Sequence, residues 1–267
     1  MRCGLMLITL LTFSVISCQK NSVTGRKQLL LLNETDVQKM ALTEYRGFLK
    51  GNPVVAAGST RDQIMVAQVG NRIARAVQTY LDGEGKGDLL KGYEWEFNLV
   101  NKPDINAWCM PGGKVVVYTG ILPVTGNEQA LAVVMGHEIA HAIAKHGNER
   151  MSQGLLQQMG GIALGAAVSS KPAETRALFM GSYGITSNVL GILPFSRKHE
   201  LEADRYGLIF AAMAGYDPGE AEAFWKRMAA AGGGKKPPEF LSTHPSDDTR
   251  IAKVREYAQE AMKYYRK

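Results

Sequence analysis

Two histidines and a glutamate stand at a spacing that binds metal ions and supports hydrolysis. His137, Glu138 and His141 form an H-E-x-x-H motif in a stretch that is predicted to be helical. Residues four apart lie one turn apart on the same face of a helix, so both imidazoles can reach one ion. Neutral imidazole suits zinc, and Glu138 can reach a water beside that ion. The motif predicts one zinc ion per chain, with Glu138 as the general base of a hydrolase.

The helix around the motif is apolar, which argues against two solvated histidines on a surface. Val133, Val134, Ile139 and Ile143 surround the motif. A buried H-E-x-x-H motif without an ion would leave polar groups unsatisfied. We therefore expect a buried helix over residues 127–146 that carries its metal ligands inward.

The third ligand is expected from a second helix, because a catalytic zinc site needs three protein ligands and one open position. Glu200 and Asp204 lie four apart in the helix predicted over residues 196–214 and share one face. Glu200 is expected to bind the ion, and Asp204 to accept an N–H from a ligating histidine. His199 remains a spare ligand, although it is displaced by about 100° from Glu200. Glu202 is expected to be a solvated carboxylate.

His146 is the histidine nearest to the motif, but its spacing does not suit a ligand. It follows His137 by nine residues, which places it near the opposite side of the helix. The metzincin pattern is also missing, because Ala144 and Gly147 stand where that pattern needs a glycine and a histidine. We expect His146 to end the helix and to interact with its dipole.

Four segments, taken in order, form a specific pattern: Asn106-Ala107-Trp108 with Pro111-Gly112-Gly113, the H-E-x-x-H helix, the S-R-x-x-E-x-x-A-D segment from Ser196, and Thr243-His244-Pro245-Ser246 with Arg250. This pattern resembles the HtpX-like and CAAX-prenyl-protease-type zinc metallopeptidases, metallopeptidase family forty-eight of the gluzincin group. The resemblance extends from about Gln28 to Arg255. It implies a zinc endopeptidase with Glu200 as third ligand, in the soluble lipoprotein branch and without the tetratricopeptide repeats of some members.

The segment around His244 has two open roles in such an enzyme. A tetrahedral oxyanion needs more than zinc for its stabilisation, and His244 is the expected catalytic donor. Alternatively, His244 fills the open zinc position in a resting state and blocks activity. Arg250 is expected to order this loop.

A Val-rich segment is expected to bind the substrate. Backbone hydrogen bonds along a strand hold an extended peptide with loose sequence specificity. The residues assigned to this role are Asn106, Lys114, Val115, Val116, Val117 and Tyr118. The fold expected around them is α+β and mainly α-helical. It is a gluzincin metallopeptidase domain with a small β-sheet whose edge strand lines the active-site cleft.

Capping residues and alternation predict the remaining elements. Residues 95–99 alternate between apolar and polar side chains, as in a half-buried strand. Helices are expected to begin at Asn33, Thr60, Asp217 and Ser246. The apolar stretches 154–168 and 177–195 are interrupted by polar or small residues. They are expected to pack in the core or to cover the cleft as a flap.

The first 17 residues have the pattern of a bacterial lipoprotein signal. Arg2 precedes an apolar run over residues 5–16, which is too short to span a bilayer. Ser17 and Cys18 end this run as in a lipobox, so we expect cleavage before Cys18 and lipidation of its thiol. Gln19 follows the cysteine, and the absence of an aspartate there favours the outer membrane. Three parts are expected: the signal peptide 1–17, a lipidated tether 18–32, and a zinc metallopeptidase domain 33–267.

Composition agrees with a folded enzyme and excludes several other classes. The 267 residues are 45% hydrophobic and 21% charged, which rules out wholesale disorder, a fibrous repeat and a polytopic membrane bundle. The net charge of +6 is modest and not clustered, so nucleic acid is not an expected partner. Cleavage of the signal would leave Cys109 as the one free thiol, so no intrachain disulfide is expected.

Together these features predict a zinc-dependent endopeptidase of the bacterial cell envelope that hydrolyses peptide bonds in unfolded or misassembled envelope proteins. Lipid at Cys18 would hold it to the outer membrane, facing the periplasm. The rival hypothesis is a zinc-binding envelope lipoprotein that acts as a chaperone or assembly factor with little proteolysis. An intact Glu138 argues against this rival, because an inactive relative commonly loses its base or a ligand.

Overall fold

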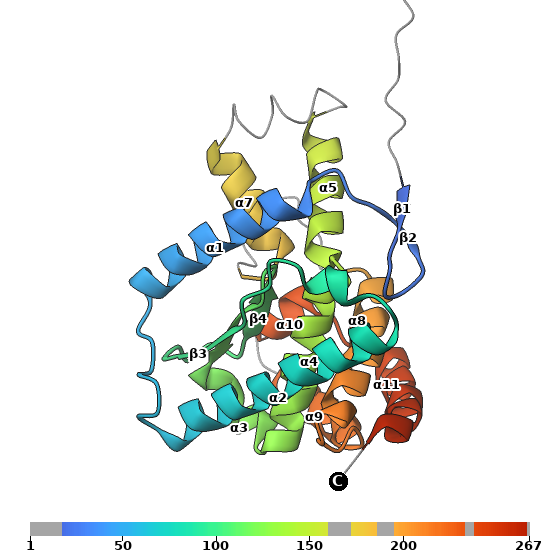
Figure 1. Cartoon of the computed structure of the whole chain (residues 1–267). Helices are drawn as coiled ribbons and strands as arrows, with labels where there is room; N and C mark the ends of the chain where they lie inside the picture. Colours follow the sequence, from blue (N-terminus) through green and yellow to red (C-terminus); the bar gives the residue numbers. More distant parts are fainter. Residues whose placement is uncertain (1–17, 160–171, 186–194, 233–237, 266–267) are drawn as a thin grey trace, which may run out of the picture.

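The computed structural model describes residues 18–159, 172–185, 195–232 and 238–265. Helices dominate it, and α4 (Glu128–Ile143) runs through the centre of the molecule (Figure 1). The other α-helices are α1 (Glu34–Gly51), α2 (Arg61–Gly83), α3 (Leu122–Thr125), α5 (His146–Met159), α7 (Pro172–Ser182), α8 (Arg197–Met213), α9 (Glu220–Ala231), α10 (Glu239–Thr243) and α11 (Asp248–Ala261). Short 3₁₀ turns are η1 (Gly87–Leu90), η2 (Thr119–Ile121) and η3 (Met262–Tyr264). This α+β, mainly helical architecture confirms the expected fold class.

A small mixed sheet packs against α4. It consists of β3 (Glu96–Val100), β4 (Ala107–Met110) and β5 (Lys114–Tyr118), in the order β3-β5-β4. β3 pairs with β5 in parallel, and β4 pairs with β5 antiparallel. The strand predicted over residues 95–99 is therefore confirmed, one residue further along the chain.

The segment Lys114–Tyr118 is the middle strand of this sheet, and the prediction that it offers an edge to a substrate is wrong. Its backbone is paired on both sides, and its side chains are buried. The strand at the edge beside α4 is β4. Alternation along one segment predicts a strand, but the order of strands depends on pairing between segments far apart in the chain.

The capping residues predicted for two helices are confirmed. The Asn33 side chain accepts the Thr35 N–H at 2.8 Å before α1, and Thr60 caps α2 in the same way. The helix predicted from Ser196 is present as α8, and the Ser196 side chain caps it. Two later starts differ slightly from the prediction. α9 begins at Glu220, after Asp217 has formed a turn with Gly219, and α11 is capped by Asp247 instead of Ser246.

The helix predicted over residues 127–146 is present but ends three residues earlier than expected. α4 ends at Ile143, and Lys145 has a left-handed backbone with φ of 57°. This residue breaks the helix and redirects the chain, so that His146 begins α5. The prediction that His146 ends a helix and interacts with its dipole is therefore wrong.

The two apolar stretches are described only in part. α5 and α7 cover their well-placed sections, whereas residues 160–171 and 186–194 lie outside the described residues, as does the predicted signal 1–17. Within the described ranges, no helix combines the length and the apolar character needed to cross a membrane.

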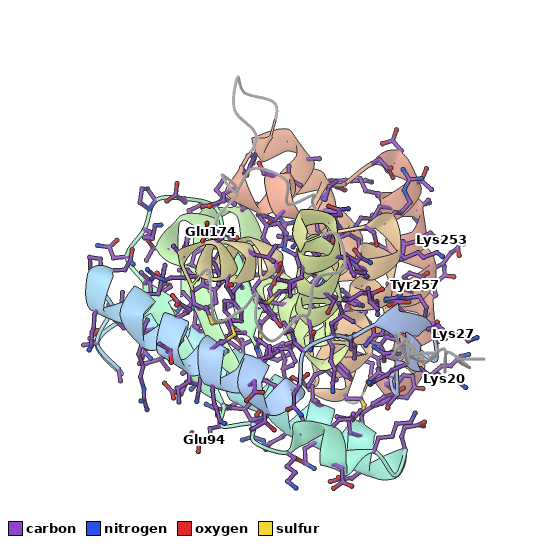
Figure 2. The ribbon with its side chains drawn as sticks, turned by 90° about the horizontal axis from the view of Figure 1, so that it is seen from above. Lys20, Lys27, Glu94, Glu174, Lys253 and Tyr257 are labelled. Atoms are coloured by element: carbon purple, nitrogen blue, oxygen red, sulfur yellow. The ribbon has the colours of Figure 1, made fainter. Side chains whose placement is uncertain are left out.

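The N-terminal residues form a hairpin that docks on the helices. Strands β1 (Cys18–Lys20) and β2 (Lys27–Leu29) pair antiparallel. The Asn21 amide donates to the Ala144 carbonyl at 2.7 Å, and the Tyr206 hydroxyl donates to the Val23 carbonyl at 2.8 Å. Figure 2 shows Lys20 and Lys27 on the same side of the molecule as Tyr257 of α11. The segment 18–32, predicted to be a tether, thus contains a docked hairpin, while its lipidation stays a prediction.

Helices α4 and α8 meet backbone to backbone at two glycines. A Cβ atom on Gly207 would lie 2.7 Å from the backbone nitrogen of His137 and 2.8 Å from the carbonyl carbon of Gly136. A Cβ atom on Gly136 would lie 2.5 Å from the carbonyl oxygen of Gly207. Backbone atoms cannot turn aside as a flexible side chain can. The two glycines therefore set how closely these helices approach.

We expect Gly207→Ala to destabilise the protein, because the added methyl group would push α8 away from α4. Overpacking of this kind costs about 1–3 kcal/mol. Gly47→Ala is the matched control, since Gly47 lies exposed within α1 and its Cβ would meet nothing within 4 Å. It should raise the stability by about 0.5–1 kcal/mol. Urea unfolding measures both effects, and an unchanged midpoint in Gly207→Ala would contradict the close crossing.

Candidate metal centre

Helix α4 presents both motif histidines to one point. The Nε2 atoms of His137 and His141 lie 3.0 Å apart, and both side chains are buried. Two ring nitrogens that face each other this closely share at most one proton or one cation. The predicted pairing of the two imidazoles on one helix face is therefore present.

Helix α8 brings Glu200 to the same point. Its Oε1 lies 3.3 Å from His141 Nε2, and its Oε2 lies 3.4 Å from His137 Nε2. The Nδ1 atom of His244 lies 3.1 Å from Glu200 Oε1 and 3.3 Å from His137 Nε2. Ligand atoms of these four residues all lie within 4.8 Å of one another, and all four side chains are buried.

This donor set fits zinc. Four atoms bound tetrahedrally at about 2.0–2.1 Å stand about 3.3 Å apart, close to the spacings of the two nitrogens and the carboxylate. Imidazole nitrogen and carboxylate oxygen are also ligands that zinc prefers. His137, His141 and Glu200 would hold the ion, and His244 stands where a fourth ligand would lie.

The charges around the centre favour a cation. Burial alone would lower the pKa of His137, but the carboxylates of Asp204 and Glu200 outweigh it and raise this pKa to about 9. Burial drives the pKa of His141 well below its ordinary value, which keeps that imidazole neutral and able to bind metal. Burial opposes the charge of Glu200, yet Arg250 and His244 hold the pKa of that carboxyl well below its usual range.

Glu138 is placed as expected for a base beside this centre. Its side chain is buried, and its Oε1 lacks a hydrogen-bond partner among the residues that the structure describes. His244 Nε2 lies 3.6 Å away. Burial raises the pKa of Glu138, against the opposing effect of His244 and His137. A raised carboxyl pKa suits a group that takes up and releases a proton.

Asp204 and Arg250 hold the first ligand and the His244 loop together. Asp204 Oδ1 lies 2.9 Å from His137 Nδ1, and its role as an acceptor for this histidine stays a prediction. The Arg250 guanidinium donates to both oxygens of Asp204 at 2.8 and 2.9 Å, and its Nη1 lies 2.6 Å from Glu200 Oε2. Nη1 also donates to the carbonyls of His244 and Pro245, at 3.3 and 3.0 Å. Arg250 therefore lies where it can order this loop.

Three residues near the centre do not lie where the sequence placed them. His146 is buried beside the second ligand, with its Nδ1 3.0 Å from His141 Nδ1. Glu202, expected in solvent, lies with its Oε2 2.9 Å from His146 Nε2. His199, the spare ligand, contacts Glu149 at 3.0 Å. The helix break at Lys145 turns His146 back toward the motif, and helical spacing alone could not reveal it.

The comparisons with known proteins agree with this geometry. The sequence profile of peptidase family M48 matches residues 66–258, and the chain therefore belongs to this family. The mitochondrial metalloendopeptidase OMA1 of Schizosaccharomyces pombe is 37% identical over 191 residues, covering 71% of this chain and 53% of that protein. The human mitochondrial metalloendopeptidase OMA1 is 31% identical over 250 residues, covering 90% of this chain and 46% of that protein.

A bacterial protease is also similar. The beta-barrel assembly-enhancing protease of Escherichia coli is 30% identical over 171 residues, covering 62% of this chain and 35% of that protein. The chain spans about half the length of the two OMA1 relatives. The expected metallopeptidase family and its zinc dependence are confirmed, whereas placement among the HtpX-like and CAAX-prenyl-protease-type members stays a prediction.

We expect Glu200→Gln to weaken zinc binding, because it replaces a charged ligand by a neutral amide. The loss should exceed the factor of about 10 to 100 that is typical when a residue behind a ligand is removed. Zinc content after dialysis against a chelator measures the loss. Glu256→Gln is the control, since this carboxylate lies exposed on α11 and pairs with Lys253. Full zinc content in Glu200→Gln, with loss on replacing His199 instead, would contradict the assignment.

Proposed function

We propose that the protein is a zinc-dependent endopeptidase that hydrolyses peptide bonds in unfolded or misassembled proteins of the bacterial cell envelope. The observation that carries this proposal is the buried carboxylate of Glu138. Its Oε1 has no hydrogen bond within the described ranges, although His244 Nε2 lies 3.6 Å away, and it stands beside a complete zinc ligand set. A carboxylate buried without a hydrogen bond costs free energy, and a proton-transfer role accounts for its place here.

The reaction follows from the position of this carboxylate. Zinc held by the three ligands would supply a Lewis acid for the scissile carbonyl. Glu138 takes a proton from the attacking water while the water oxygen bonds to the carbonyl carbon. The carbon–nitrogen bond then breaks, and Glu138 passes the same proton to the leaving amine. Asp204 and Arg250 keep His137 in its orientation during these steps.

We propose the outer edge of β4 as the surface for an extended substrate, in place of β5, although the four residues of β4 are buried in this structure. The Tyr118 N–H donates to the Asn106 carbonyl. In an antiparallel pair, every second residue directs its N–H and C=O toward the partner strand. The backbone groups of Ala107 and Cys109 therefore point away from β5. The Ala107 N–H is held by the Asn106 side chain at 2.9 Å. Cys109 is buried in β4, which packs against α4, and burial together with the Glu138 carboxylate raises the pKa of its thiol. N-methylation of alternate peptide amides should block cleavage if this edge binds the substrate.

Glu138→Gln tests the proposed function against the rival chaperone role. It should abolish cleavage of an unfolded protein and leave zinc content unchanged, because the base is lost while the ligands stay. Chelator treatment of the native protein should abolish cleavage as well, and added zinc should restore it. Suppression of client aggregation by both the native protein and Glu138→Gln, without cleavage by either, would support the rival chaperone and contradict the peptidase.

We further propose that His244 fills the fourth zinc position at rest. Its Nδ1 stands at ligand spacing from His137 and Glu200. The position of the ring thus supports the resting-state role over the catalytic donor role.

His244→Ala separates the two roles at matched zinc content. If His244 is a resting ligand, only the fraction of enzyme with an open fourth position is active. Removing His244 should then raise kcat/KM by the inverse of that fraction. As a donor, its removal should lower kcat by about 10²- to 10³-fold. Ser246→Ala is the control, since the Ser246 hydroxyl has no hydrogen-bond partner within the described part of the chain. Equal rates in both variants and the native enzyme would contradict both roles.

For location, we infer lipid attachment at Cys18 and an outer-membrane site facing the periplasm. The lipobox-like pattern before Cys18 supports attachment, and the name of the Escherichia coli relative refers to barrel assembly. The OMA1 relatives carry names that place them in mitochondria, so the envelope location belongs to this proposal alone. Cys18→Ser should release the protein from membrane fractions, and unchanged fractionation would contradict lipid anchoring.

A further inference from the structure

The second zinc ligand, His141, uses its two ring nitrogens for different contacts. Its Nε2 faces His137 and Glu200, and its Nδ1 faces His146 Nδ1 at 3.0 Å. When Nε2 gives its lone pair to a metal ion, the ring proton must stand on Nδ1. His141 then donates to His146, whose Nδ1 must accept.

This constraint fixes the next bond as well. With Nδ1 of His146 accepting, the proton of that ring stands on Nε2. Nε2 lies 2.9 Å from Oε2 of Glu202 and donates to it. Each ring proton in this chain of contacts therefore stands on one particular nitrogen. This arrangement leaves the lone pair of His141 Nε2 directed toward the ion.

Arg26 fixes the end of the chain. Its Nε donates to Glu202 Oε1 at 2.7 Å, and its Nη1 and Nη2 donate to the two oxygens of Glu149 at 2.8 and 2.6 Å. Glu149 in turn contacts His199, whose ring stacks on His146 with centroids 4.5 Å apart. One guanidinium thus holds both carboxylates that position the stacked pair.

Arg26 belongs to the N-terminal hairpin, which is anchored at the helix break. The Asn21 amide donates to the carbonyl of Ala144, next to the left-handed Lys145 that redirects the chain into His146. The first ligand, His137, has a similar arrangement, since Arg250 fixes the carboxylate of Asp204 beside it. A carboxylate that an arginine holds in place thus stands directly beside His137, and another stands behind His141 with His146 between them.

We propose that Arg26 is a positioning residue for the zinc ligand His141, acting through Glu202 and His146, so that the N-terminal hairpin is part of the metal centre. This inference rests on the zinc site of the proposed function. It adds that a segment more than a hundred residues before the motif in the sequence controls zinc affinity.

The test measures zinc affinity of the full chain by chelator competition, together with the visible spectrum of the cobalt-substituted protein. Arg26→Ala and His146→Phe should each weaken zinc binding by about 10- to 100-fold, as loss of an outer-sphere partner does. Arg26→Lys should recover part of this loss, because an ammonium can still pair with Glu202. Arg205→Ala is the matched control, since Arg205 lies on α8 close to Glu202 but pairs with Glu260.

Two comparisons make the test specific to positioning. The double variant Arg26→Ala/His146→Phe should bind zinc no more weakly than His146→Phe alone, because both residues act through one chain of contacts. The cobalt spectrum should change in both single variants and stay native in Arg205→Ala. Native zinc affinity in Arg26→Ala, or losses that add fully in the double variant, would overturn the proposal.

The outcome is independent of peptidase activity. A protein that binds zinc tightly, loses it in Arg26→Ala and cleaves no peptide would overturn the proposed function while the positioning role stands. An active enzyme whose Arg26→Ala variant keeps native zinc affinity and spectrum would overturn only the positioning role. Unfolding of Arg26→Ala with chelator present shows whether the variant is folded, and Arg26→Lys serves if it is not.

Discussion

The metal centre depends on the close approach of two helices at Gly136 and Gly207. His137 follows Gly136 directly on α4, and Glu200 lies two turns before Gly207 on α8. Since neither glycine has space for a Cβ atom, the helix backbones touch. This contact places the Glu200 carboxylate of α8 3.3 Å from His141 and 3.4 Å from His137 of α4. These distances match the spacing between two ligands of a tetrahedral zinc ion. A larger distance between α4 and α8 would move Glu200 away from the two histidines while each helix stayed intact.

Burial of Arg250, Asp204 and Glu200 is tolerated because these charged groups pair with one another at short distances. Arg250 is almost fully buried, contacts Asp204 and Glu200, and lies 3.8 Å from the ring centroid of Trp225. A bidentate guanidinium holds a carboxylate in one orientation, which a single ammonium cannot do. Removing one partner of such a pair leaves an uncompensated buried charge, so the network around the centre is expected to be lost as a unit.

The sequence predicted the parts of the site that depend on local spacing. The i, i+4 pairs His137–His141 and Glu200–Asp204 share helix faces whatever the rest of the fold does, and the caps at Asn33 and Thr60 are short-range contacts. The features it missed arise from contacts between distant segments or from one backbone angle. The central place of β5 depends on pairing with two other strands. The role of His146 depends on the turn at Lys145, and no periodicity predicts a lysine in the left-handed region.

The left-handed turn at Lys145 also carries a cost in backbone strain. An L-residue with a side chain loses roughly 1–2 kcal/mol in this conformation, which a glycine would avoid. The chain keeps a lysine there with φ of 57°, two residues after the last residue of α4. Relaxing this residue to the right-handed region would extend α4 and carry His146 away from His141. The backbone strain at Lys145 thus accompanies the turn that places His146 beside the metal ligand His141.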